Sequence, residues 1–215
     1  ITVIAQKILS QNPTADISGV MGEIERILDR SIATEGYIIR DTPESKLINL
    51  AEVDFAALAE RFKKGRKRTE FERLKMLVEE TLNRLVEENR SRIDFLERFQ
   101  RLIEDYNAGS ANIEELWARL VAFAKSLNEE SRRHVSERLT EEELALFDIL
   151  TKPGMGLTDK ERDQVKRVAR ELLETLKAAK LVIDWRKRQA ARAAVRHHIE
   201  VFLDENLPDR YSRDI

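Results

Sequence analysis

The residues of this chain best suited to a binding role are cationic, and they form a row in one stretch. Residues 181–200 read LVIDWRKRQAARAAVRHHIE and carry Arg188, Arg192 and Arg196 at a spacing of four. In a helix this spacing places all three on one side, where like charges repel by about 0.2–0.5 kcal/mol per pair. The row therefore predicts an acidic partner, which lies either within the chain or outside it.

Two interpretations of this row stay open on the sequence alone. Asp184 stands four residues before the row and Glu200 four residues after it, so ion pairs within the helix can satisfy both ends. Arg192 in the middle still needs a partner, so internal ion pairs and an acidic surface on another molecule both stay open. Trp185 lies in the apolar stripe of the same helix, and we expect it in the core. The predicted partner-binding residues are Arg186, Lys187, Arg188, Arg192 and Arg196.

A second cationic group occupies residues 63–68, which read KKGRKR between two predicted helices. Exposed basic loops supply sequence-independent contacts to phosphate, and a flexible, solubilising linker is the alternative. No aromatic residue stands within the run to stack on a base, which disfavours single-stranded nucleic acid as the partner. The predicted nucleic-acid-binding residues are Lys63, Lys64, Arg66, Lys67 and Arg68.

The sequence offers no convincing catalytic or metal-binding pattern. It contains neither GxxxxGK[ST] nor GxGxxG, the glycine-rich loops that bind phosphate. Its histidines are His134, His197 and His198, and the adjacent two lie about 100° apart on a helix, so they cannot face one metal ion. A Glu-x-Lys triplet at residues 44–46 has the spacing of a nuclease motif, but it follows a proline in a predicted turn. We therefore predict no catalytic residue, metal ligand or cofactor in this chain.

Helical periodicity runs through most of the chain. From Thr69 to Tyr106 apolar residues recur at three- and four-residue steps. This pattern predicts either one helix of about 57 Å or two helices that meet near Asn89, where the stripe is polar. Elsewhere, Thr or Asn followed three residues later by Glu indicates a capping box at a helix start. The four such pairs are Thr69/Glu72, Asn112/Glu115, Thr140/Glu143 and Thr158/Glu161.

The same pattern predicts the remaining elements. Residues 36–49 are the least helical part, with a short extended piece expected at 37–39. Further helices are expected over residues 16–33, 54–64, 112–127, 129–138, 140–150, 158–179 and 182–204. The sequence thus predicts an all-α fold, an elongated multi-helix bundle with one or two long helices.

Composition bounds the classes of function. Charged residues make up 36% of the chain, above the average of about 25% for globular domains, which is typical of long helices with solvated faces. The net charge is −2, so any contact with nucleic acid must come from a local patch. There is no cysteine and no apolar run near the ~20 residues of a membrane span. We expect a cytoplasmic protein, and a segment of a longer polypeptide because the chain begins at Ile1.

Six stretches carry a resemblance to a known family. They are ILDRSI (27–32), EGYII (35–39), DFAALAERF (54–62), NRSRIDFLERFQRLIEDYNAGS (89–110), LTEEELALFDILTKP (139–153) and LVIDWRKRQAARAAVR (181–196). Together and in this order they resemble the C-terminal helical region of the restriction (R) subunit of type I restriction–modification enzymes. None of these stretches is a catalytic motif.

The resemblance implies a role in assembly. The parent polypeptide would be an ATP-dependent type I site-specific deoxyribonuclease, with a nuclease domain and two RecA-like motor lobes that use ATP and Mg. Residues 1–50 would connect from the preceding motor domain, and residues 51–215 would form the C-terminal helical domain. This domain would dock the R subunit onto the methyltransferase core, whose modification and specificity subunits are the implied partners. A nucleic-acid-binding module that contacts DNA through its basic patches is the alternative.

Overall fold

The computed structural model describes residues 21–28, 50–109, 111–151, 155–178, 189–208 and 211. The regular structure in these residues is helical, with no strand among them, which confirms the predicted all-α class. They form two compact units, each described by itself: the central unit, residues 50–141, and the terminal unit, residues 21–28 together with those from 142 onward. The sequence-based division at residue 50, between a connection from a motor domain and the C-terminal helical domain, stays a prediction.

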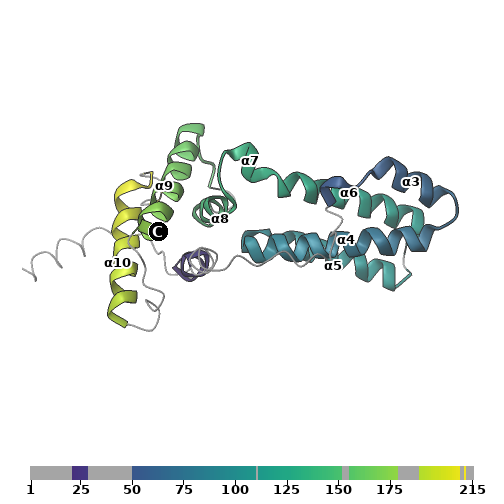
Figure 1. The fold of residues 1–215 in the computed structure, drawn as a ribbon, viewed down its shortest axis with the longest axis horizontal. Coiled ribbons are helices and arrows are strands. Elements are labelled where there is room, and N and C mark those ends of the chain that lie inside the picture. Colours follow the sequence, from purple (N-terminus) through teal and green to yellow (C-terminus); the bar gives the residue numbers. More distant parts are fainter. Residues whose placement is uncertain are drawn as a thin grey trace, which may run out of the picture. The chain divides into compact units, whose positions relative to one another are not determined.

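The central unit is organised around three packed helices. Its elements are η1 (Leu50–Glu52), α3 (Phe55–Lys63), α4 (Lys67–Glu88), η2 (Arg90–Arg92), α5 (Ile93–Asn107), α6 (Ile113–Ser131) and α7 (Arg133–Glu137) (Figure 1). α4, α5 and α6 pack against one another, and α3 packs on α4. Lys67 and Glu114, at the starts of α4 and α6, form an ion pair. Arg92, just after α4, reaches Glu130 near the end of α6, so α4 and α6 run parallel.

Stacked aromatic rings hold the core of the central unit at the start of α4. The inward face of α4 is fully buried from Phe71 to Leu85. Phe62 of α3 stacks on Trp117 of α6 with 4.3 Å between ring centroids, and Phe71 stacks on Tyr106 of α5 at 4.1 Å. Each pair contributes about 0.5–1.5 kcal/mol beyond the burial of its area. The stacks fix α3, α5 and α6 around the first turns of α4.

The periodic stretch from residue 69 to 106 forms two helices that meet at Asn89, the second of the two alternatives predicted. The backbone of Asn89 is extended, with φ −145° and ψ 106°. Its side-chain oxygen accepts hydrogen bonds from the backbone N–H of Ser91 at 3.1 Å and from the Ser91 hydroxyl at 2.8 Å. Such local bonds compete with continuation of a helix. Asn89 is only 1% exposed, so the helix break lies inside the packed unit and not at its surface.

The predicted capping pairs fare differently. Thr158 and Glu161 form a complete capping box: the Glu161 carboxylate accepts from the Thr158 N–H at 2.8 Å, and the Thr158 hydroxyl accepts from the Glu161 N–H at 3.3 Å. Asn112 caps α6 through its side-chain oxygen. The box at Thr69 is wrong, because α4 already begins at Lys67, two residues earlier.

The terminal unit contains the helical residues 21–28 and three further helices among its described residues. These are α8 (Glu141–Leu150), whose first residue closes the central unit, α9 (Asp159–Ala178) and α10 (Gln189–Asn206). α10 packs on α9, and the Gln164 side chain donates to the Asn206 carbonyl at 2.8 Å. No helix in the described part of the chain has the length and apolarity to cross a membrane. The extended piece expected at 37–39, the triplet at 44–46 and the start of the 182–204 helix lie outside the described residues.

Tyr211 gives the terminal unit a dependence on alkaline pH. Its hydroxyl donates to the Leu150 carbonyl at 2.8 Å. Burial, and secondly the Glu161 carboxylate, raises the pKa of this phenol from 10.0 to about 12. The unfolded chain therefore loses the proton from about pH 10 while the folded chain keeps it to about pH 12, so the stabilisation present below pH 10 is lost across that window.

We expect Tyr211→Phe to remove this contribution. The free energy of unfolding in urea, measured from pH 10 to 12, will then fall less steeply in the variant than in the parent chain. The comparison cancels the titration of lysines, which both chains share. Equal slopes would contradict a protonated, buried phenol at this position.

Candidate functional site

α10 presents a largely exposed surface over a narrow buried stripe. Ile199 and Leu203, four residues apart, are buried, and Val195 and Phe202 flank them half-buried. The sequence predicts an apolar stripe on this helix, and the described part of the helix has one at these positions. The exposed positions of the helix are Gln189, Ala190, Ala193, Ala194, Arg196, His197, His198, Val201, Asp204 and Glu205. Most of the α10 surface is thus available to a partner as far as the described residues show.

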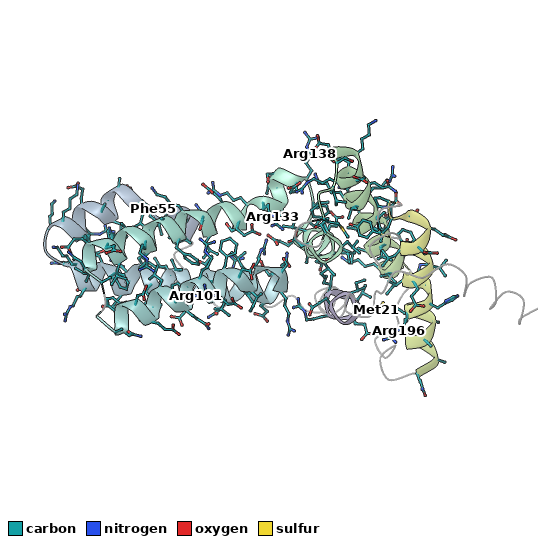
Figure 2. The ribbon with its side chains drawn as sticks, turned by 180° about the vertical axis from the view of Figure 1, so that it is seen from behind. Met21, Phe55, Arg101, Arg133, Arg138 and Arg196 are labelled. Carbon is teal, nitrogen blue, oxygen red and sulfur yellow. The ribbon has the colours of Figure 1, made fainter. Side chains whose placement is uncertain are left out.

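Arg196 is exposed on α10 (Figure 2) and makes no ion pair with any residue that the structure describes. The internal pair between Arg196 and Glu200, one of the two interpretations of the row, is therefore not formed. An exposed pair at this spacing contributes only about 0.3–0.5 kcal/mol and costs side-chain entropy, which explains why the sequence spacing did not suffice. Arg192 lies in α10 by its backbone. The other predicted partner-binding residues, Arg186, Lys187 and Arg188, lie outside the described residues together with Trp185.

The second cationic group, which we call the basic tip, spans the last residue of α3, the turn between α3 and α4 and the first two residues of α4 (Figure 1). It comprises Lys63, Lys64, Arg66, Lys67 and Arg68. Gly65 has φ +96°, a conformation that residues with a Cβ rarely adopt, and this turn lets α4 begin directly after α3. The Lys64 N–H donates to the Glu60 carbonyl at 3.1 Å, which closes the last turn of α3.

The five cations of the basic tip differ in their partners. Lys63 lies 3.4 Å from the Glu60 carboxylate and Lys67 pairs with Glu114. The remaining three are exposed and have no ion pair within the described part of the chain. These three are Lys64, Arg66 and Arg68.

Sequence reasoning missed one cation next to this group. Arg73 is exposed and has no ion pair among the described residues. It lies five residues after Arg68, less than two turns further along α4. The sequence shows Arg73, but this residue stands alone, five residues after the end of the continuous run of cations at residue 68.

The remaining polar candidates do not assemble into a reactive site among the described residues. His134 contacts the Glu141 carboxylate through Nδ1 at 2.9 Å, whereas His197 and His198 are exposed on α10. No group of three or more metal-ligating side chains is present within the described ranges. The paired carboxylates of α4 at positions 79 and 80 are exposed.

A buried ionic cluster was not anticipated from the sequence. Arg92 is 2% exposed, and its guanidinium contacts Glu130 at 2.9 Å, Glu141 at 3.1 Å and the Leu85 carbonyl at 3.3 Å. Glu141 also contacts His134. Glu130 and Glu141 follow Arg92 by 38 and 49 residues in the sequence. A pattern of locally spaced residues therefore could not predict these contacts. The cluster joins η2, α6 and the start of α8, and its role is structural.

Removal of the Arg92 side chain would empty a buried site and take the shared cation from Glu130, which is 10% exposed and 3.4 Å from Arg133, and from Glu141, which is 22% exposed. We expect Arg92→Ala to lower the free energy of unfolding by about 3–5 kcal/mol, the usual cost of breaking a buried ion pair. Arg101→Ala is the matched control, since Arg101 is 73% exposed and lies 3.7 Å from Glu97 (Figure 2). Its cost should stay below about 1 kcal/mol. Similar urea midpoints for the two variants would show that the cluster does not hold the unit.

The described residues form an all-α protein with exposed cationic surfaces. Comparison with known proteins identifies its family. The chain matches, over residues 2–214, the family described as Type I restriction enzyme HindI endonuclease subunit-like, C-terminal. It therefore belongs to this family, as the resemblance predicted. It is also 30% identical over 128 residues to the putative type I restriction enzyme MjaIXP endonuclease subunit of Methanocaldococcus jannaschii. That alignment covers 56% of this chain and 12% of the relative. No solved structure matches the chain.

Proposed function

We propose that this chain is a non-catalytic assembly domain of a type I restriction enzyme endonuclease subunit. It docks the ATP-dependent, DNA-translocating nuclease subunit onto the methyltransferase core of modification and specificity subunits. Membership of the family supports the first half of this proposal. The observation that carries the second half is Arg196, an exposed arginine on α10 without an ion pair among the described residues.

The chemistry of α10 suits a protein partner with an acidic surface. Arg196 and Arg192 stand four residues apart, and arginine forms two parallel hydrogen bonds to a carboxylate, which gives geometric specificity. The exposed alanines at positions 190, 193 and 194 allow a partner surface to approach the helix closely. Such a contact would remove the repulsion between like charges in the row. In this proposal ATP hydrolysis and DNA cleavage, with ATP and Mg as cofactors, belong to other parts of the parent polypeptide.

Charge reversal on α10 tests the docking role. In sedimentation velocity at moderate salt, we expect the unsubstituted 215-residue chain, called the parent chain below, to co-sediment with its cognate methyltransferase core. Arg192→Glu with Arg196→Glu should abolish this association, because like charges set against an acidic partner cost several kcal/mol.

The matched control is Arg132→Glu with Arg167→Glu, which changes the net charge equally at two exposed arginines without ion pairs in the described residues. This control should still associate. Assembly of the α10 variant would move the docking surface elsewhere. A parent chain that is folded by circular dichroism and yet does not associate would refute the docking role of this region.

A further inference from the structure

We propose that the basic tip is a contact site for the phosphate backbone of double-stranded DNA. Its contacting residues are Lys64, Arg66 and Arg68, and Arg73 extends the site along α4. The site lies in the central unit, whereas the proposed docking helix α10 belongs to the terminal unit. The inference goes beyond the docking role and does not rest on it.

The charge of the basic tip is available because the nearby acids are already engaged. Every carboxylate between residues 60 and 73 contacts a cation other than the four named above, and so does Glu114 across on α6. The pairs are Glu60–Lys63 at 3.4 Å, Glu70–Arg61 at 3.4 Å, Glu72–Lys75 at 3.1 Å, and Glu114–Lys67. Four cations are thus left without a neutralising partner in the described structure.

The backbone that carries these cations is held from both sides. Phe62, just before the turn, stacks on Trp117, and Phe71, just after it, stacks on Tyr106. Gly65 supplies the one positive φ that the turn requires. A turn whose backbone is anchored in this way does not have to order its backbone on binding, which lowers the entropy lost.

The chemistry of the surface selects duplex phosphate over other acidic partners. Between residues 60 and 73 the only apolar side chains are Phe62 and Phe71, which are 5% and 0% exposed. Single-stranded nucleic acid needs exposed aromatic rings on which bases stack, and protein interfaces need buried apolar or aromatic anchors. The basic tip offers neither, and the nearest exposed apolar side chain on α4 is Met76, three residues beyond Arg73. A duplex needs only cations, since it presents one negative charge per ~1.7 Å of its axis.

The exposed carboxylates of α4 limit the extent of the site. Glu79 and Glu80 follow Arg73 by about two turns, are exposed and have no ion pair among the described residues. They would repel phosphate, so the DNA contact is confined to the turn and the first two turns of α4. With an overall charge of −2, binding must be local and must weaken steeply with salt.

Fluorescence anisotropy with a labelled 20-base-pair duplex of arbitrary sequence tests the site without any methyltransferase core. We expect the 215-residue chain to bind at low salt and to weaken as KCl is raised. The variant Lys64→Gln, Arg66→Gln, Arg68→Gln should bind more weakly and should reduce the slope of log K against log[salt] by about 2.7, at ~0.9 per phosphate contact.

The matched control is Lys160→Gln, Arg132→Gln, Arg167→Gln, which also removes one lysine and two arginines that are exposed and without ion pairs in the described residues. Circular dichroism confirms that each variant is folded. Equal loss in both triple variants, or no binding by the parent chain, would overturn the site. So would tighter binding of the single strand, or of a labelled polyglutamate peptide, than of the duplex. Loss of docking in the sedimentation experiment leaves these outcomes unaffected.

Discussion

The arrangement of the central unit depends on one buried guanidinium. Arg92 stands where α4 gives way to α5, and it binds carboxylates from the end of α6 and from the first residue of α8. A buried charge is tolerated only when it is paired and hydrogen-bonded, so these segments must meet around Arg92 if its charge is to stay buried. The extended backbone of Asn89 ends α4 three residues before Arg92.

This constraint also separates what the sequence could predict from what it could not. The all-α class and most helix positions followed from local periodicity and from caps such as Asn112, since both are read within a few residues. The Arg92 cluster joins residues dozens of positions apart, and nothing in their local spacing marks them as partners. Asn89 lies between these cases: its polarity suggested a break, but only its burial and its bonds to Ser91 show why the break is required.

The candidate surfaces were predictable by residue type but not by availability. Spacing suggested that Arg196 could pair with Glu200, and the structure leaves that arginine without a partner among the described residues. The sequence gives no ground to distinguish the five cations of the basic tip. In the structure, Lys63 and Lys67 form ion pairs with carboxylates. Pairing depends on where neighbouring helices bring their carboxylates, as Glu114 of α6 shows, and that is a property of packing.

The overall charge of −2 therefore says little about binding. The chain has 38 basic and 40 acidic residues, and what a partner meets is the subset left over after internal ion pairs form. On α4 this subset changes sign along the helix, from Arg68 and Arg73 to Glu79 and Glu80. A phosphate backbone can approach only the first part of that helix. In the proposed site, the packing that pairs the nearby carboxylates with other cations thus determines where phosphate would bind.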